Sequence, residues 1–304
     1  MVKQPITAER SFLIAHILSM AFGLAGLLLV LPNPNFILNL PDFGKTAFSW
    51  SMAGGGVVYM LLGTAAISIY AYRTLGVWHW LSFMIPAIFI SLGSELLGTS
   101  TGFPFGHYHY LNGLGYKIAG LVPFTIPLSW FYLGFAAYLI ARSGLATRSI
   151  PDWLRDLTAI AFGALTLTSW DFVLDPAMSQ TTVPFWIWEQ PGAFFGMPYQ
   201  NFAGWLGTGA LFMFVATLLW KKAPLSLPNQ DLGLPLAVYL SNFAFSTIMS
   251  LAAGIWLPVL LGLILGVTPM LVFYWLAIST KDEPHDPVVT SEATPVRTVV
   301  GSRI

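Results

Sequence analysis

Long apolar segments constrain the fold of this chain more than any other feature. Windows of helical length, composed mainly of apolar residues, recur at residues 12–31, 50–72, 77–97, 122–141, 157–174, 203–220, 235–253 and 256–278. A helix needs about 20 such residues to cross the hydrocarbon core of a bilayer. The strands of a membrane barrel would instead alternate apolar and polar residues. We therefore predict an all-α, polytopic membrane helix bundle with about eight transmembrane helices.

Composition agrees with an integral membrane protein and excludes several other classes. Only 9% of the residues are charged, whereas a soluble domain carries about 25%. Because cysteine is absent, there is no disulfide framework and no thiolate nucleophile. The net charge of zero, without a basic face, argues against a nucleic-acid partner. The first window has no small-residue cleavage site before Pro32, so we expect a retained helix rather than a signal peptide.

The distribution of Lys and Arg predicts the orientation. If the N-terminus lies inside and eight helices follow, the outer loops hold only Lys45 and Lys117 of the 13 Lys and Arg residues. This asymmetry satisfies the positive-inside rule, so we expect both termini in the cytoplasm. We divide the chain into an integral-membrane helical domain at 1–280 and a tail at 281–304. The tail is polar, contains proline and has no periodicity, so we expect it to be disordered.

Two loops on the predicted outer side are long and rich in Gly, Pro and aromatic residues. They cover residues 98–121 and 175–202 and carry almost no positive charge. Loops of this length in a compact bundle are usually functional. Each loop follows a predicted helix that has an acidic residue near its outer end. The sequence therefore indicates a functional site at this face of the bundle.

The acidic residues of these helices are the strongest candidates for chemistry. Glu95 and Asp171 lie inside helical windows, where an unpaired acid is costly and usually functional. Asp175 follows Asp171 by one turn on the same helix face, and we expect Pro176 to end the helix after it. A carboxyl group in apolar surroundings keeps its proton more readily and can act as a general acid. The alternative is that these acids cap loops or bind backbone amides at the interface.

Aromatic residues are concentrated around these acids. The residues concerned are Trp170, Phe172, Trp186, Trp188, Phe194, Phe195, Tyr108 and Tyr110. Aromatic faces attract positive charge, an interaction that strengthens when water is excluded. Any single ring can be explained by an interfacial belt or by packing. Their concentration on one side of the bundle, beside three acids, favours a site that stabilises a cation.

A pair of histidines stands in the stretch "GTSTGFPFGHYHY", residues 98–110. His107 and His109 have the spacing of two metal ligands, with Glu95 as a third. No other histidines cluster in the chain, so we do not predict a metal site. Histidine titrates near neutral pH, which suits proton handling or a hydrogen bond beside the substrate. A purely structural role in the loop stays open as the alternative.

Three segments carry a family resemblance: "SELLGTSTGFPFGHYHY", "SWDFVLDPAM" and "FWIWEQPGAFFGMPYQNFAGW". They resemble the integral-membrane carotenoid 1,2-hydratases, of the γ-carotene 1′,2′-hydratase and bisanhydrobacterioruberin hydratase type. The resemblance implies a lyase of carotenoid biosynthesis, for example in myxoxanthophyll-type pathways. Such an enzyme adds water across the terminal C1–C2 double bond of an acyclic ψ-end group, as in γ-carotene or lycopene, and makes a tertiary alcohol without cofactor or metal. The implied partners are the carotenoid, water, the bilayer and, as further candidates, other enzymes of the pathway.

The residues themselves suggest how such a reaction would proceed. We expect Asp171 or Glu95 to protonate the alkene, while Asp175 adjusts the acidity of its neighbour or receives the proton from water. Candidates for positioning this water are His107, His109, Tyr199 and Asn201. Candidates for contact with the substrate are Trp170, Tyr108, Tyr110, Phe105, Trp186, Trp188, Phe195, Tyr199 and Asn201, with the three tryptophans flanking the cation.

Two other functions use some of the same features. A proton-coupled transporter also contains intramembrane acids, but it would line the midplane of the membrane with polar residues from both halves of the chain. A carotenoid- or lipid-binding scaffold without chemistry would need the aromatic residues but not the acids. The hydratase differs from both because it yields a pigment that is heavier by one water.

Overall fold

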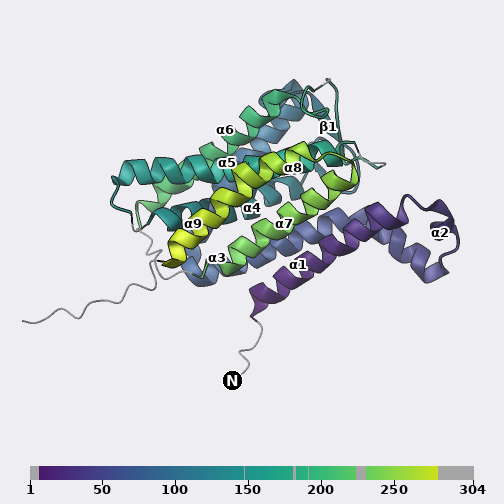
Figure 1. Ribbon diagram of the computed structural model, residues 1–304, viewed down its shortest axis with the longest axis horizontal. Coiled ribbons are helices and arrows are strands. Elements are labelled where there is room, and N and C mark those ends of the chain that lie inside the picture. The colour runs from purple at the N-terminus through teal and green to yellow at the C-terminus, as the bar shows by residue number, and fades with distance from the viewer. Residues whose placement is uncertain (1–6, 147, 181–182, 191, 224–230, 280–304) are drawn as a thin grey trace, which may run out of the picture.

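The computed structural model describes residues 7–146, 148–180, 183–190, 192–223 and 231–279. These residues form a bundle of long, roughly parallel helices, with short strands at one end (Figure 1). Six helical stretches in the described part are long and apolar enough to cross a membrane. The predicted all-α membrane fold is therefore confirmed. The tail predicted at 281–304 lies outside the described residues.

The elements follow one another along the chain in a simple order. They are α1 (Ala8–Ala25), η1 (Gly26–Val30, one π-helical turn), α2 (Pro34–Leu38), α3 (Asp42–Thr101), β1 (Tyr108–Tyr110), β2 (Lys117–Ile118), β3 (Val122–Pro123), α4 (Thr125–Leu145), α5 (Asp152–Met178), β4 (Trp186–Trp188), α6 (Tyr199–Trp220), α7 (Gly233–Ala252), α8 (Leu257–Gly262), η2 (Leu263–Val267) and α9 (Thr268–Ser279).

All the predicted apolar windows coincide with helices, and two of them lie in the 60-residue α3. Gly76 divides α3 into two arms, 42–75 and 77–101, because its φ of 83° and ψ of 169° are not helical. The chain reverses there: Gly56 in the first arm and Gly98 in the second both approach the loop after α3. Only glycine adopts this backbone conformation readily. The break at Gly76 thus brings both arms to the same end of the bundle.

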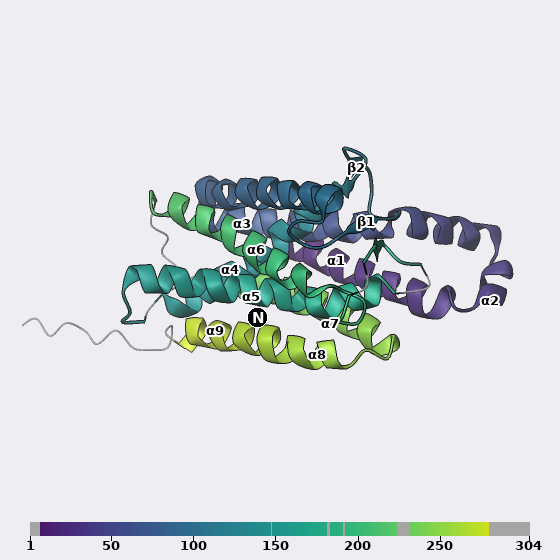
Figure 2. The ribbon, with the colours of Figure 1, turned by 90° about the horizontal axis from the view of Figure 1, so that it is seen from above.

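Helix α4 occupies the centre of the bundle. Figure 2 places it between the second arm of α3 and the α8–α9 segment. Almost all of its side chains are buried, among them Trp130, Tyr132 and Tyr138. A helix that is apolar all round is expected to be buried on every side. The other helices are therefore arranged around α4, and its N-terminal end faces the strands.

The end of the bundle away from the strands is held by charges. Asp156 at the start of α5 accepts a hydrogen bond from Arg142 at 2.9 Å and lies 3.3 Å from the Lys221 ammonium group. The Arg142 guanidinium also lies over the Trp220 ring, 5.8 Å from its centroid. These basic residues are among those that we expect on the inner side. That this end faces the cytoplasm stays a prediction.

The prediction that Pro176 ends its helix is wrong. Helix α5 continues through Pro176 to Met178. Proline removes only one backbone donor, and the last turn is completed by Ser179, whose N–H donates to the Asp175 carbonyl at 3.0 Å. The side chain of Gln180 in turn donates to the Pro176 carbonyl at 2.9 Å. Asp175 therefore stays on the helix, one turn beyond Asp171.

Two glycines let the loop after α3 enter the bundle. Phe105 is only 1% exposed and lies between the second arm of α3 and α6. A Cβ atom at Gly98 would come within 2.7 Å of the Phe105 ring, and a Cβ atom at Gly204 would meet the opposite edge of the same ring. Real Cβ atoms do not approach so closely, so any side chain at either position would displace Phe105 from its place.

We predict that Gly98→Ala lowers the stability of the protein. The added methyl group overpacks the contact with Phe105, which typically costs about 1–3 kcal/mol. The matched control is Gly93→Ala in the same helix, where a Cβ atom meets nothing within 4 Å. That change is expected to leave stability equal or slightly higher, since alanine favours a helix. Thermal unfolding of both variants in detergent tests this, and equal midpoints would contradict it.

Candidate active site

A short β-ribbon joins the two outer loops. Strand β1 pairs with β4 in antiparallel register, with Tyr108 opposite Trp188 and Tyr110 opposite Trp186. The sequence analysis expected only loops in this region. Because successive side chains of a strand point to opposite faces, the two tyrosines point into the bundle and His109 between them points outward. The ribbon thus closes a cavity from the outer end.

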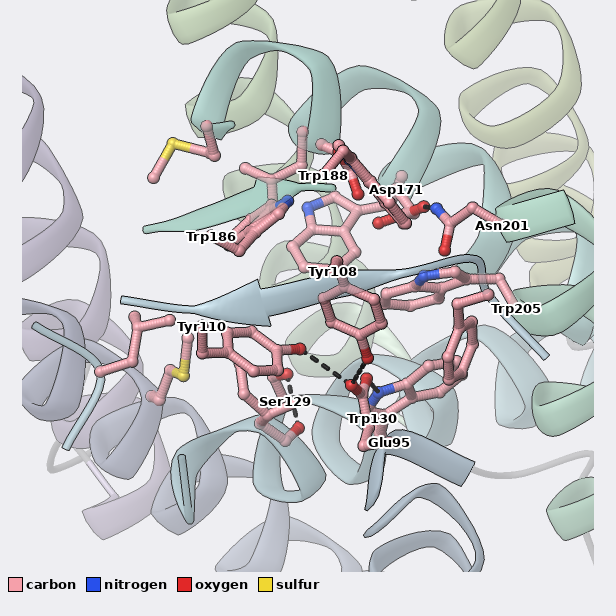
Figure 3. Close-up of a pocket in the computed structure, with 18 of the residues that line it drawn as sticks. Glu95, Tyr108, Tyr110, Ser129, Trp130, Asp171, Trp186, Trp188, Asn201 and Trp205 are labelled. Atoms are coloured by element: carbon pink, nitrogen blue, oxygen red, sulfur yellow. Dashed lines mark hydrogen bonds between the residues drawn. The ribbon is translucent and has the colours of Figure 1, made fainter. Parts of the chain in front are cut away.

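The cavity lies between this ribbon and helices α3, α4, α5 and α6 (Figure 3). Its volume is about 60 Å³. Its polar lining residues are Glu95, Tyr108, Tyr110, Ser129, Asp171, Asp175 and Asn201. Its aromatic walls include Phe105, Trp130, Trp170, Trp186, Trp188 and Trp205. The structure therefore brings the predicted acids and most of the predicted aromatic residues together around one space.

Glu95 is surrounded by hydrogen-bond donors. One carboxyl oxygen, Oε1, accepts from the Trp130 indole N–H at 2.9 Å. The other, Oε2, accepts from the Tyr110 hydroxyl at 2.9 Å and from the Tyr108 hydroxyl. The side chain is only 2% exposed. A carboxylate is an acceptor only, so these three donors suit the ionised form of Glu95 and orient its side chain between α3, α4 and the ribbon.

The two tyrosines are suited to remain donors. Both lie on β1, outside the helices, and are almost completely buried. Burial raises the pKa of the Tyr108 and Tyr110 hydroxyls well above the usual value, and the adjacent carboxyl of Glu95 adds to the effect. A buried phenol next to a negative charge keeps its proton. Both hydroxyls therefore stay neutral donors toward Glu95 over the physiological pH range.

Asp171 and Asp175 form the second acidic group. They are 2% and 4% exposed, lie one turn apart on α5 and both line the cavity. Asp171 accepts a hydrogen bond from the Asn201 amide at 2.7 Å, and Asp175 accepts one from the Trp188 indole N–H at 2.8 Å. Within the described residues, neither acid forms an ion pair with Lys, Arg or His. The pair is thus supported by neutral donors alone.

The aromatic walls are packed in defined geometries. Trp130 stacks on Trp205 with ring centroids 3.8 Å apart and an angle of 18°. Trp170 meets Trp205 edge to face at 5.9 Å, and its indole N–H is buried without a hydrogen-bond partner among the described residues. A buried donor without a partner is an expected binding place for water or a ligand. Such a rigid wall can surround a cation and still hold a polar molecule at one point.

The two histidines of the outer loop lie outside the cavity. His109 is exposed, and its Nδ1 atom pairs with Glu189 Oε1 at 2.9 Å on the outer face of the ribbon. His107 is exposed as well, with its ring against Gly102. The prediction that they position water is not supported by this geometry, because the alternation of β1 turns the tyrosines inward and the histidines outward.

Two other predicted contact residues also lie outside the cavity. Tyr199, at the start of α6, is 62% exposed. Phe195 is 38% exposed in a loop where its φ of 48° turns the chain. Both contact Phe194 in a separate aromatic cluster. In contrast, Asn201 lies one turn inside α6 and faces Asp171, as a water-positioning residue would.

Several residues that line the cavity were not predicted from the sequence. Trp205 follows Asn201 by four residues, so both lie on the same face of α6, and this spacing was a usable signal. Trp130 and Ser129 lie in an apolar window without an acid, and nothing in the sequence distinguishes them from core residues. Among the described residues, no group of three His, Cys, Asp or Glu side chains is placed to hold a metal ion.

Comparison with known proteins identifies a family whose model covers the cavity. A family model described as "Carotenoid biosynthesis protein" matches residues 55–269, which include every residue that lines the cavity. The bisanhydrobacterioruberin hydratase of Haloarcula japonica is 36% identical over 141 residues, a segment that spans 46% of this chain and 46% of that relative. No solved structure matches the chain. The chain belongs to the carotenoid biosynthesis protein family.

Proposed function

We propose that this protein is a carotenoid hydratase that adds water across the terminal C1–C2 double bond of an acyclic ψ-end group. A γ-carotene- or lycopene-like pigment is the proposed substrate, and a tertiary 1-hydroxy carotenoid is the product. The family and the hydratase name of the Haloarcula japonica relative support the reaction class. The acid mechanism rests on the chemistry of the cavity.

One observation carries the proposal: two acids one turn apart line an aromatic cavity without any basic partner. Asp171 and Asp175 are buried and receive hydrogen bonds only from neutral groups among the described residues. Two negative charges so close together in an apolar site repel each other. We infer that this pair holds a proton that it can give to a substrate, as paired carboxyl groups of acid catalysts do.

In the first step, Asp171 donates this proton to C2, the less substituted carbon of the double bond. The π electrons form the new C–H bond and leave a tertiary cation at C1. Asp171 is the better donor than Glu95, because both oxygens of Glu95 already accept hydrogen bonds. The indole faces and the Glu95 anion then stabilise the cation, an electrostatic effect that is strongest where water is excluded.

In the second step, one water molecule attacks the cation at C1. The new C–O bond forms, and the excess proton of this water passes to the carboxylate, which restores the acid. Asn201 and the unpartnered indole N–H of Trp170 line the cavity and can hold the water. Asp175 lies one turn away and can receive the proton. The balance is the addition of one water, with no cofactor consumed.

The transporter alternative has less support. Helices α7, α8 and α9 contain no acidic residue, so the buried acids of the cavity come from α3 and α5 alone. A transporter would be expected to place polar groups from both halves of the chain around its site. The binding scaffold needs no acid at all, so the variants below distinguish it from the hydratase.

We predict that Asp171→Asn lowers hydration by about 100-fold or more, because it removes the transferable proton and keeps the shape of the side chain. The measurement is pigment mass spectrometry in cells that accumulate γ-carotene or lycopene. Glu189→Gln is the matched control, since it makes the same change on the exposed outer face of the ribbon. If Asp171→Asn and Glu95→Gln both add water as well as the wild type, the acid mechanism is wrong.

We predict that Tyr108→Phe lowers both turnover and thermal stability. It removes one donor from the buried Glu95 carboxylate, and a hydrogen bond to a charged group contributes about 1.5–3 kcal/mol. Turnover should fall about tenfold if half of this lost hydrogen-bond energy appears as weaker stabilisation of the cation. Tyr116→Phe in the same loop is the control, because Tyr116 is 78% exposed. Equal turnover and equal thermal stability of the two variants would show that Glu95 has no part in the mechanism.

We predict that His109→Ala keeps hydration within about twofold of the wild type. The ring is exposed and its ion pair with Glu189 lies outside the cavity, where such pairs contribute little. The same pigment assay gives the measurement, with His107→Ala in parallel. A tenfold loss in either variant would mean that the histidines do act on the reaction.

A further inference from the structure

A second cavity lies beside the first. It has a volume of about 70 Å³ and lies between α1, η1 and the first arm of α3, and Phe185 and Phe245 complete its walls. Three residues, Tyr59, Leu114 and Met178, line both cavities. The two spaces therefore adjoin at these shared side chains, and together they extend from the acids to α1.

The two cavities differ in chemistry. The first contains three acids, whereas no acidic or basic residue lines the second. Its polar side chains are the hydroxyl groups of Ser19, Ser51 and Tyr59, and the remaining lining residues are apolar or glycine. An elongated hydrocarbon fits such a surface, because the hydrocarbon needs no hydrogen-bond partner and its binding is favoured by the burial of apolar area.

Glycines form much of the wall of the second cavity and leave its space open. A Cβ atom at Gly23 or Gly26 would meet nothing within 4 Å, and one at Gly55 would meet only Ser51 of its own helix. Gly26 also begins the π-helical turn η1, and such turns occur frequently at functional sites. A side chain at any of these positions would project into free space.

The second cavity also has access to lipid. Gly23, Gly26 and Gly55 are half-buried rather than enclosed. Large apolar side chains on the neighbouring turns of α1 and α3 are exposed, among them Phe22 and Trp50, which are 61% and 75% exposed. A hydrophobic molecule dissolved in the bilayer would therefore reach this opening without crossing water.

We propose that the second cavity holds the polyene chain of the substrate and admits the molecule from the bilayer between α1 and α3. The inference rests on the proposed function. A carotenoid is about as long as the ~30 Å hydrocarbon core, so a site that takes one end group must let the rest of the molecule leave. The shared residues Tyr59, Leu114 and Met178 would then surround the chain where it passes from one space to the other.

Two cavity-filling variants test the proposal. Gly55→Leu and Gly23→Leu place a side chain in the second cavity from opposite walls. Gly54→Leu is the matched control, since Gly54 precedes Gly55, also has free space around it and does not line either cavity. The measurement is binding of lycopene to the purified protein, followed by quenching of tryptophan fluorescence, with thermal unfolding as a check on the fold.

We expect Gly55→Leu and Gly23→Leu to weaken lycopene binding at least tenfold, and Gly54→Leu to bind like the wild type. Asp171→Asn is expected to bind lycopene normally and to form no hydrated product. If Gly55→Leu binds as tightly as Gly54→Leu, the proposal is overturned. If the wild type binds lycopene in a Gly55-dependent manner but never hydrates it, the proposed function fails and the binding site stands.

A labelling experiment tests the site without changing its shape much. The chain contains no cysteine, so Ser51→Cys introduces a single thiol into the wall of the second cavity. Ser49→Cys is the control, because Ser49 is exposed and does not line the cavity. Bound lycopene is expected to slow alkylation of the first variant at least tenfold and to leave the second unchanged. Equal rates with and without lycopene would overturn the proposal.

Discussion

A carboxylate buried in an apolar bundle needs hydrogen-bond donors, and the outer half of this structure depends on how Glu95 obtains them. Its partners come from α4 and from both inward positions of β1. Strand β1 in turn holds β4, whose Trp188 supports Asp175 on α5. A single buried carboxyl group therefore links three helices through one ribbon. Without it, the Tyr108 and Tyr110 hydroxyls would lose the acceptor that they share.

The acids at the two ends of the bundle are stabilised in different ways. Asp156 is bound by Arg142 and Lys221, which neutralise it. Within the described residues, the acids of the cavity accept hydrogen bonds only from neutral donors. No fixed cation therefore balances the negative charge that they carry when they are ionised. This difference agrees with the proposed mechanism. A structural acid is best paired with a permanent cation, whereas an acid that must give and regain a proton is better served by groups that orient it and leave its charge free to act.

The sequence was informative where a physical constraint acts on single residues. The length of an apolar run predicted each long helix, and the cost of an acid in the membrane singled out Glu95, Asp171 and Asp175, which the fold brings to one cavity. Prediction from the sequence failed where contacts between distant segments determine which residues face the cavity. The pairing of β1 with β4 determines which side of the loop faces the cavity, so the sequence did not show that His107 and His109 lie outside it. Trp130 was missed for the same reason, because only the fold places its indole N–H beside Glu95.

The reversal of α3 at Gly76 has a consequence for how the protein can vary. The first arm supplies Gly55 to one cavity and the second arm supplies Glu95 to the other, and no flexible loop lies between them. Each residue of a helix turns the following ones by about 100°. Inserting or deleting one residue between Gly56 and Gly76 would rotate one cavity wall relative to the other, although every side chain type was kept. The spacing along this hairpin is therefore constrained more strictly than the identity of most of its residues.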